Sequence, residues 1–396
     1  MGDLFHEELQ ALRARSLHRK LREVGSAQGP NVELVGKRLI NFSSNDYLGL
    51  TTDPRLREAA IATINEFGVG AGASRLISGT QSPHVRLENA LAKWKGTQAA
   101  LCFSSGYAAA VGTLQALLTR NDVVLLDKLS HASLIDGAKL SGATIRVFPH
   151  NHLGKLESHI EWARRERPQA RVVIVTESVF SMDGDRAPLR ELIELKKRFQ
   201  ALLFLDEAHA IGVVGPNGRG LAAEENVNAE VDIQMGTLSK AIGVSGGYVC
   251  GARSLIEWLI NRSRSFIFST APPPALAAAA LSAVEFLGSA AGEERRLLLW
   301  KKINLMRRLL PKDRSAQSET LKTKPASAIF PWIVGDEQAA IDLSGALMNE
   351  GFFVPAIRYP TVAKGSARLR ITVTALHDDA QIEALASALA RLSTAK

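Results

Sequence analysis

The segment LLFLDEAH, residues 202–209, is a short apolar run that ends in charged side chains. Similar runs occur at VVLLD (123–127), TIRVF (144–148), VVIVTES (172–178) and GYVCG (247–251). Helical patterns accompany them, at RLENALAKWKG (86–96), YAAAVGTLQALLT (107–119) and APLRELIELKKRFQ (187–200). Strands that are apolar throughout and alternate with helices are typical of a mostly parallel sheet with helices on both faces. The sequence therefore predicts a doubly wound α/β fold, in which ligands bind at the carboxyl ends of the strands.

The chain is expected to contain more than this α/β part. We expect a large domain at 46–285, preceded at 1–45 by an N-terminal helix and short strands, and followed at 286–396 by a smaller α+β domain. Leucines at 4, 9, 12, 17 and 21 predict a helix from 4 to about 24. The pieces SAIFPWIVG, FFVPAIR and ARLRITVT predict late strands, and a final helix is expected at about 378–393. The N-terminal segment is expected to join the C-terminal domain.

The composition is that of a globular protein with a basic surface. Of the 396 residues 46% are hydrophobic and 22% charged, and the formal net charge is +8. The charge has two explanations: a surface for an anionic partner, or a basic surface without a specific role. No basic stripe is interleaved with aromatic residues, so we expect a small anionic substrate and no nucleic acid.

The two cysteines and the N-terminus favour a cytoplasmic protein. Cys102 and Cys250 lie in apolar runs and are predicted to be buried thiols, which suits a reducing compartment; no metal site is expected. The N-terminus has no apolar core of a signal peptide. The stretch PALAAAALSAVEFLGSAAG (274–292) contains Glu285 and is rich in alanine, so it predicts a buried helix and no membrane span.

Asp206 and His209 follow the strand predicted at 202–206. A carboxylate at the end of a buried strand needs a cationic partner to remain charged. A protonated pyridine nitrogen is one such partner, and His209 would reach an oxygen on the same ring. A structural salt bridge explains Asp206 equally well.

Lys240 lies among hydroxyls and small residues, in GTLSKA (236–241), ahead of several glycines. Desolvation lowers the pKa of a lysine and makes its neutral amine available to form an imine with an aldehyde. Thr237 would then bind a phosphate group. The alternative is an ordinary lysine in a loop.

Two further segments suit a phosphorylated aromatic cofactor. In FSSGY (103–107) a helix begins after Ser and Gly, which presents free N–H groups to an anion, with Tyr107 close by. His131 follows another predicted strand, where it would stack on a ring or serve as an ordinary loop histidine. Taken singly, neither segment decides the function.

In combination these motifs resemble the α-oxoamine synthases, which are fold-type I pyridoxal-phosphate (PLP) enzymes. The resemblance runs from about residue 38 to 376. The matching segments are NFSSNDYLGL, GASRLISGTQSPHVRLE, FSSGYAA, LSHASLIDGA, TESVFSMDGDRAPL, DEAHAIGVVGPNGRG, GTLSKAIGVSGGYVCG and FIFSTAPPP.

The resemblance implies a role for each matching residue. The catalytic residues would be Lys240, which carries the cofactor, Asp206 at the ring nitrogen and His131 stacked on the ring. The remaining cofactor residues would be Gly106, Tyr107, Ser181, His209, Thr237 and, from a neighbouring subunit, Thr270. The substrate residues would be Asn45 and Arg370 for the amino acid, Thr361 beside the acyl chain, and Arg19 or Arg22 for a distal acyl carboxylate.

The segments NDYLGL, GVSGG and AIRYPTVAKGSARLR are most similar to the family member of biotin biosynthesis. This implies a decarboxylative condensation of L-alanine with a pimeloyl thioester, carried by coenzyme A or an acyl carrier protein, in a homodimer. Tyr359 and Ala363-Lys364 depart from the usual family pattern beside the acyl site. The alternatives are a relative that uses glycine or serine with another acyl-CoA, a transaminase or aldolase, and a non-catalytic partner subunit of the same fold.

Overall fold

The computed structural model describes residues 4–310 and 327–394 and divides the chain into two compact units. The large unit comprises Leu48–Ser181 and Arg186–Leu297. The small unit comprises the chain up to Tyr47, the segment Met182–Asp185 and the chain from Leu298 onward. The domain boundaries predicted from the sequence stay a prediction.

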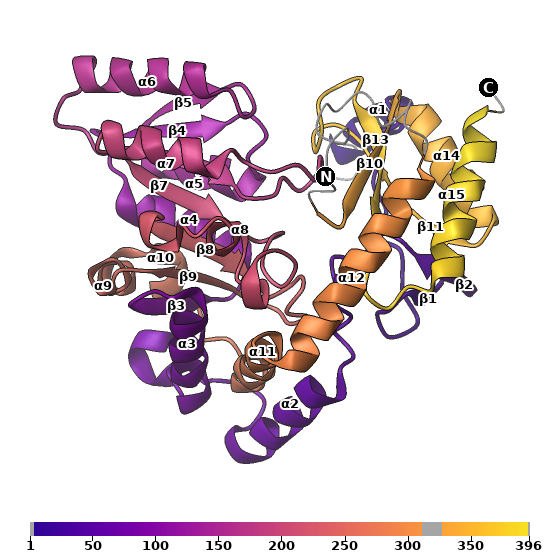
Figure 1. Ribbon diagram of the computed structural model, residues 1–396, viewed down its shortest axis with the longest axis horizontal. Coiled ribbons are helices and arrows are strands. Elements are labelled where there is room, and N and C mark those ends of the chain that lie inside the picture. Colours follow the sequence, from indigo (N-terminus) through magenta and orange to yellow (C-terminus); the bar gives the residue numbers. More distant parts are fainter. Residues whose placement is uncertain (1–3, 311–326, 395–396) are drawn as a thin grey trace. The chain divides into compact units, whose positions relative to one another are not determined.

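The large unit is built on a seven-stranded sheet in the order β3-β9-β8-β7-β6-β4-β5 (Figure 1). Its strands are β3 (Ala99–Phe103), β4 (Val123–Asp127), β5 (Thr144–Phe148), β6 (Val172–Glu177), β7 (Leu202–Asp206), β8 (Ile233–Thr237) and β9 (Gly247–Gly251). Only β9 runs antiparallel to its neighbours β3 and β8, whereas the pairs from β8 to β5 are parallel. The predicted mostly parallel sheet is confirmed.

Helices pack around this sheet, because its central strands are apolar on both faces. Every residue of β4 and β6 is buried, as the continuous Val/Ile/Leu runs predict. The helices of this unit are α2 (Pro54–Phe67), α3 (Ser82–Lys95), α4 (Gly106–Leu117), α5 (Ala132–Ser141), α6 (Leu153–Glu166), α7 (Leu189–Arg198), α8 (Leu221–Glu224), α9 (Arg253–Arg262), α10 (Arg264–Ile267), α11 (Pro274–Leu287) and the start of α12 (Ala290–Leu309). Helix α4 packs on α5 and on β8 and β9, and α6 packs on β4 and β5.

Four parallel strands end at one edge of the sheet and deliver polar side chains there. β4 ends in Asp127, β6 in Glu177, β7 in Asp206 and β8 in Thr237. Glu177 pairs in register with Asp206. Strand β8, IQMGT, was not among the runs that the sequence analysis selected, because a buried Gln234 interrupts its apolar pattern; the Nε2 of Gln234 donates to the Asn228 carbonyl at 3.0 Å.

The small unit joins both ends of the chain in its sheets. One sheet has the order β1-β2-β11 and the other β10-β13-β12. The elements are β1 (Asn31–Leu34), β2 (Lys37–Asn41), β10 (Ile329–Gly335), α14 (Glu337–Asn349), β11 (Phe352–Phe353), β12 (Ala356–Ile357), β13 (Ala367–Thr372) and α15 (Asp379–Thr394). The parallel pairing of β11 with β2 confirms that the N-terminal segment joins the C-terminal part.

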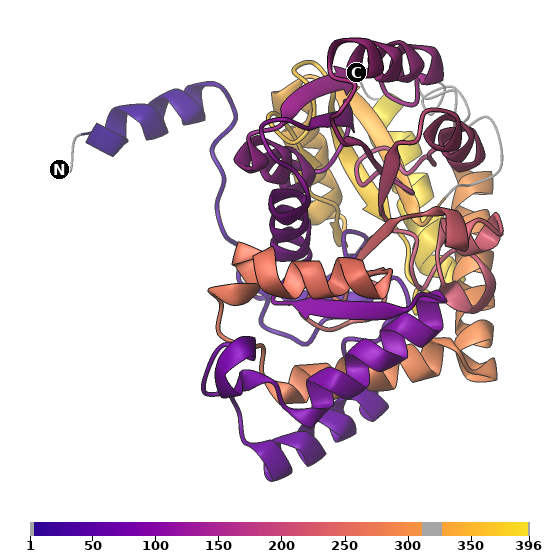
Figure 2. The ribbon, with the colours of Figure 1, turned by 90° about the vertical axis from the view of Figure 1, so that its left-hand side faces the viewer.

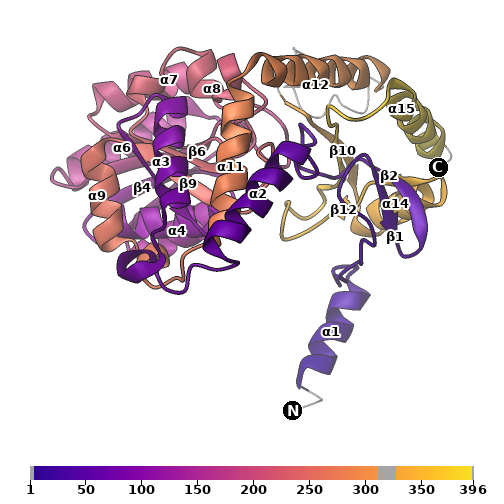
Figure 3. The ribbon, with the colours of Figure 1, turned by 90° about the horizontal axis from the view of Figure 1, so that it is seen from below.

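The N-terminal helix is shorter than predicted. Helix α1 spans Leu4–Ala14 and not 4 to about 24. The chain leaves the helix at Ser16, whose φ of 54° is left-handed. Figure 3 shows α1 standing away from strands β1 and β2 of its own unit, and Figure 2 shows the extended segment that follows α1. The side chains of residues 5–14 are exposed, including Phe5, Leu9 and Leu12.

The alanine-rich stretch at 274–292 forms buried helix α11 and the beginning of α12, with a break at Gly288 and Ser289. Within residues 4–310 and 327–394 no single helix has the length and apolar character of a membrane span. Helices α11 and α12, bent by 78°, meet that criterion only as a pair and only by length and composition.

Candidate functional site

A cavity of about 230 Å³ opens at the carboxyl edge of the large unit's sheet. Seven of the predicted cofactor residues line it: Gly106, Tyr107, His131, Asp206, His209, Thr237 and Lys240. Ser105, Ser133, Glu177, Ala208, Met235 and Ser239 complete the lining. Two predicted cofactor residues do not line this cavity: Ser181, which is buried, and Thr270, which is exposed.

Lys240 lies in the connection between β8 and β9. This connection is closed at its base, because the Leu238 N–H donates to the Gly246 carbonyl at 2.9 Å and the Val244 N–H donates to the Leu238 carbonyl at 2.8 Å. Lys240 Nζ lies 2.7 Å from Nε2 of His209. The backbone therefore fixes where the amine is presented, and an aldehyde in the cavity would lie within its reach.

Asp206 faces the same cavity with only 5% of its surface exposed. Its Oδ1 accepts the N–H of Ala208 at 2.8 Å. Burial raises the pKa of the Asp206 carboxyl, whereas Lys240, this hydrogen bond and His131 act in the opposite direction. A cationic ring nitrogen in the cavity would supply the charge that holds Asp206 ionised.

The start of α4 provides an anion site. Ser105 Oγ accepts the Ala108 N–H and the Ser105 carbonyl accepts the Ala109 N–H, both at 3.0 Å. In the described part of the chain this leaves the N–H groups of Gly106 and Tyr107 for a ligand. A Cβ on Gly106 would lie 3.3 Å from Thr237, so glycine lets the helix start approach the Thr237 hydroxyl closely. The Tyr107 hydroxyl itself donates to Asp136 at 2.8 Å.

His131 precedes α5 and caps its first turn. Its Nδ1 accepts the Ser133 N–H at 3.3 Å and lies 2.8 Å from the Ser133 hydroxyl. The pKa of His131 is lowered, mainly by desolvation and against the influence of Asp206. A neutral imidazole at the cavity suits stacking on an aromatic ring.

Glu177 is a site residue to which the sequence analysis gave no role. It is 3% exposed, and its Oε1 accepts the backbone N–H of His131 at 2.6 Å. Burial, and next the charge of Asp206, raise its pKa to about 8. Its place at a strand end, one strand from Asp206, is the signal by which it could have been found.

Asn45 and Arg370, which are predicted to bind the amino-acid substrate, lie in the small unit, where Tyr47 contacts both. Arg370 Nη2 donates to the Tyr47 hydroxyl at 3.4 Å, and this hydroxyl lies 3.3 Å from Asn45 Oδ1. Burial raises the pKa of Tyr47, against the effect of Arg370, so the phenol stays neutral. Tyr47 belongs to the NDYLGL motif but was not selected from the sequence.

Arg19 and Thr361, which are predicted to bind the acyl substrate, also meet in the small unit. Arg19 Nη2 lies 3.3 Å from Thr361 Oγ1. Arg358 donates to the carbonyl of Ser16 and, at 3.4 Å, to that of His18, which anchors the segment before Arg19. Burial, and then the charges of Arg19 and Arg22, lower the pKa of Arg358. The positive charges of Arg19 and Arg22 therefore act on Arg358, and an anion bound among these groups would offset this repulsion.

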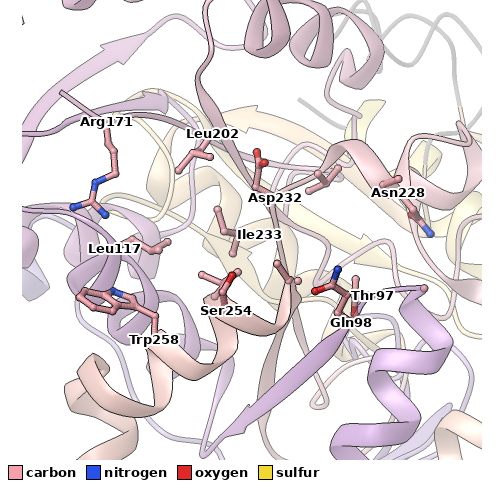
Figure 4. A pocket seen from close by; sticks show the side chains of 16 residues that line it. Thr97, Gln98, Leu117, Arg171, Leu202, Asn228, Asp232, Ile233, Ser254 and Trp258 are labelled. Atoms are coloured by element: carbon pink, nitrogen blue, oxygen red, sulfur yellow. The ribbon is translucent and has the colours of Figure 1, made fainter. Parts of the chain in front are cut away.

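A second cavity, of about 910 Å³, opens at the opposite edge of the sheet, where β7 and β8 begin (Figure 4). Its floor is apolar, with Leu202, Ile233 and Trp258. Its charged members already have partners: Asp232 accepts from Lys196 Nζ at 2.8 Å, and Arg171 lies 3.5 Å from Asp122. Although it is larger, this cavity lacks the convergent reactive groups of the first.

The smaller cavity fits PLP. It combines a helix start and a threonine hydroxyl for the phosphate, a lysine amine for the aldehyde, and a buried carboxylate for the ring nitrogen. Each feature is weak evidence when taken alone, and only the fold brings them to one edge of one sheet.

Comparisons with known proteins agree with this geometry. The family model for Aminotransferase class I and II matches residues 37–389. An 8-amino-7-oxononanoate synthase from Geobacter sulfurreducens is 45% identical over 385 residues, or 97% of this chain and 96% of that protein. One from Anaeromyxobacter dehalogenans is 47% identical over 388 residues, or 98% and 95%. A serine palmitoyltransferase from S. paucimobilis, solved with PLP and myriocin bound, has a TM-score of 0.90 at 30% identity, covering 99% of this chain and 98% of that one.

Proposed function

Because this chain belongs to the aminotransferase class I and II family, we propose that it catalyses the reaction of its curated relatives, as an 8-amino-7-oxononanoate synthase of biotin biosynthesis. In this reaction L-alanine condenses with a pimeloyl thioester, giving 8-amino-7-oxononanoate, carbon dioxide and the free thiol. The observation that carries the proposal is the convergence of Lys240, His209, Asp206 and the α4 start on one cavity. Pyridoxal phosphate is the cofactor.

Bound PLP supplies a ring that withdraws electrons from the α-carbon of the amino acid. In the proposed reaction Asp206 keeps the ring nitrogen protonated, and His209 donates to the ring oxygen. Lys240 would accept the α-proton of L-alanine, and the hydrogen-bonded connection that carries it fixes where its amine is presented. His131 would stack on the ring and limit the orientation of the bonds at the α-carbon.

We assign the two substrate carboxylates to residues of the small unit. Arg370, oriented by Tyr47, would bind the carboxylate of L-alanine through a bidentate pair, with Asn45 beside it. Arg19 beside Thr361, together with Arg22 and Arg358, would bind the distal carboxylate of the pimeloyl chain. This cluster explains why a short dicarboxylic acyl chain would be preferred over a long uncharged one.

We further propose that the enzyme acts as a cytoplasmic homodimer in which Thr270 reaches the phosphate of the neighbouring subunit. Supporting this, large apolar side chains are exposed on the large unit, with Ile77 at 80% and Phe268 at 70%, and on α1 of the small unit. The two buried free cysteines suit a reducing compartment. The basic segment Arg13–Arg22 would suit an acidic acyl carrier protein, and coenzyme A is the alternative carrier.

Substrate profiling of the purified holoenzyme tests the proposal. L-alanine, glycine and L-serine are each combined with pimeloyl-CoA and with palmitoyl-CoA, and the products are identified by mass spectrometry. We expect 8-amino-7-oxononanoate from L-alanine and pimeloyl-CoA at a higher kcat/KM than any other pair gives. Lys240→Ala is expected to lose this turnover and the visible absorption that borohydride removes from the wild type.

A second candidate is an α-oxoamine synthase that joins serine to a long acyl chain, which the TM-score of 0.90 to a serine palmitoyltransferase favours. The same profiling decides between them, because a preference for L-serine and palmitoyl-CoA would replace our proposal with this one. A non-catalytic partner subunit is disfavoured, since Lys240, Asp206 and His131 are all present and all three line the cavity that the start of α4 also lines.

A further inference from the structure

Among the described residues that line the smaller cavity, Glu177 is the one buried ionisable side chain to which the proposed reaction gives no task. It is contributed by the end of β6, beside Asp206 at the end of β7, and the two residues pair in register. Their exposed fractions are 3% and 5%. Two carboxylates therefore share one desolvated strand edge.

The charges around this edge do not balance two ionised carboxylates. Lys240 is the cation that favours ionisation of both Glu177 and Asp206, and Asp127 at the end of β4 adds a further negative charge. The nearby Glu207 is already matched, because it forms an ion pair with buried Lys95. Two like charges at one buried edge cannot both be stabilised by a single amine, so one carboxyl keeps its proton.

The surrounding charges identify Glu177 as the protonated member. The hydrogen bonds do not separate the two carboxyls, because Glu177 accepts the N–H of His131 and Asp206 accepts that of Ala208. Asp206 has both Lys240 and His131 favouring its charge. Glu177 experiences the negative charges of both Asp206 and Asp127, and together with burial these raise its pKa to about 8. Its Oε1 can accept the His131 N–H in either protonation state.

We propose that Glu177 is a positioning residue that holds a proton beside Asp206, so that Asp206 alone carries the negative charge, and that anchors His131 at the cavity through its backbone. The roles of Asp206 and His131 in this inference rest on the proposed function. The protonated state of Glu177 does not, because it follows from the protein's own groups.

The first test needs neither cofactor nor turnover. Thermal midpoints of the cofactor-free protein are compared with those of Glu177→Gln, which mimics the neutral acid and cannot ionise. Between the ordinary pKa of 4.5 and about 8 the folded wild type holds a proton that the unfolded chain releases, so its stability falls as pH rises through this window. We expect the advantage of Glu177→Gln to grow from about pH 5 to about pH 8 and then to level off.

The matched control is Glu194→Gln, which removes an exposed carboxylate from α7 and so corrects for the loss of one surface charge. A pH-independent difference for Glu177→Gln would mean that Glu177 is ionised throughout, and the inference would be wrong. This outcome leaves the proposed function standing.

The second test separates anchoring from general packing. Glu177→Gln keeps an acceptor for the His131 N–H, whereas Glu177→Leu removes it at similar size. We expect the Gln variant to retain a kcat at least about 10-fold above that of the Leu variant, with similar bound cofactor and similar KM for L-alanine. Equal kcat values would contradict the anchoring role. If the Leu variant does not fold, the comparison of wild type with Glu177→Gln across pH still tests whether Glu177 holds a proton. Absence of product from the wild type would count against the proposed function and not against this inference.

Discussion

At the residue scale, the proposed reaction depends on a carboxylate that is held ionised inside the protein. Asp206 is buried, its pKa is raised, and it faces Lys240 across the cavity. An amide at this position keeps the size but cannot hold a ring nitrogen protonated. We expect Asp206→Asn to lower kcat by roughly 10²- to 10⁴-fold, since a charge matched to the transition state is lost.

Steady-state kinetics with L-alanine and pimeloyl-CoA would measure this loss, with Asp342→Asn on α14 as the control. The bound cofactor, quantified after release in alkali, separates failed chemistry from failed binding. A kcat for Asp206→Asn within about threefold of the wild-type value would show that Asp206 only stabilises the end of the strand.

The sequence alone was enough to predict those cavity residues that lie in a motif typical of their chemistry. Lys240, Asp206, His209, Thr237 and Gly106 lie in distinctive local patterns, and the structure brings all five to one cavity. Their individual roles stay predictions. Glu177 and Tyr47 were not selected, because what distinguishes them is a neighbour on another strand or segment: Asp206 for Glu177, and Arg370 for Tyr47.

At the element scale, β9 and the start of α4 must approach each other closely. A Cβ on Gly247, the first residue of β9, would lie 2.5 Å from the Ser105 carbonyl and 2.6 Å from the Gly106 backbone. We expect Gly247→Ala to displace the helix start and to weaken PLP binding by about 10-fold or more, because the free N–H groups lose their positions.

Fluorescence titration of the cofactor-free protein with PLP would measure this affinity. Gly345→Ala in α14 is a matched control, since its added Cβ would meet nothing within 4 Å. That change is expected to stabilise the protein by about 0.5–1 kcal/mol, because alanine favours helix more than glycine does. Unchanged PLP affinity in Gly247→Ala would mean that this part of the backbone adjusts freely.

The segment after β13 contains a pH-sensitive contact. His377 donates to the Asn41 carbonyl at 3.0 Å, accepts the Thr374 N–H at 3.0 Å and stacks on Phe42 with ring centroids 4.2 Å apart. Burial lowers its pKa to about 4. Between this value and the ordinary 6.5 the unfolded chain binds a proton that the folded chain refuses, so stability falls as pH drops through this window.

We expect protonation of His377 to lower the free energy of unfolding of the wild type by up to about 3 kcal/mol between pH 6.5 and 4. A His377→Gln variant would lack this decrease. Urea denaturation of both proteins across this range, followed by circular dichroism, measures the difference. Parallel curves for the two proteins would show that His377 titrates normally.

The sequence also predicted elements unequally. Continuous apolar runs identified β4, β6 and β7, which are buried on both faces. β8 was harder to detect, because its buried glutamine is satisfied by a loop carbonyl that the local pattern does not reveal. The leucine periodicity beyond Ala14 predicted more helix than forms, because these residues turn back at Ser16 to meet Gln338 and Arg358 of the small unit.

At the scale of the whole molecule, the predicted cofactor residues, from Gly106 to Thr270, all belong to the large unit. PLP is therefore expected to slow hydrogen exchange mainly in peptides from the ends of β6, β7 and β8 and from the start of α4. Peptides from β1 and β2 should change less, because they lie in the small unit. Exchange measured by mass spectrometry with and without PLP tests this, and equal protection in both units would contradict it.

The alternation of strands and helices was enough to predict the class of the large unit, but no local pattern names the partner of an isolated short strand. Ile40 of β2 pairs with Phe352 of β11, and only the folded chain reveals this choice. The hydrophobic pattern of a strand indicates which of its faces is buried, but it does not determine which strand pairs with it.

This same pairing has a consequence for synthesis on the ribosome. All seven strands of the large sheet have been translated by Gly251, whereas β2 waits for β11, roughly 300 residues behind it. At about 5–20 residues per second the delay is roughly 15 to 60 seconds. During this interval the nascent large sheet can already be complete, while the β1-β2 hairpin, whose Val32 and Leu39 are buried in the folded chain, still lacks its third strand.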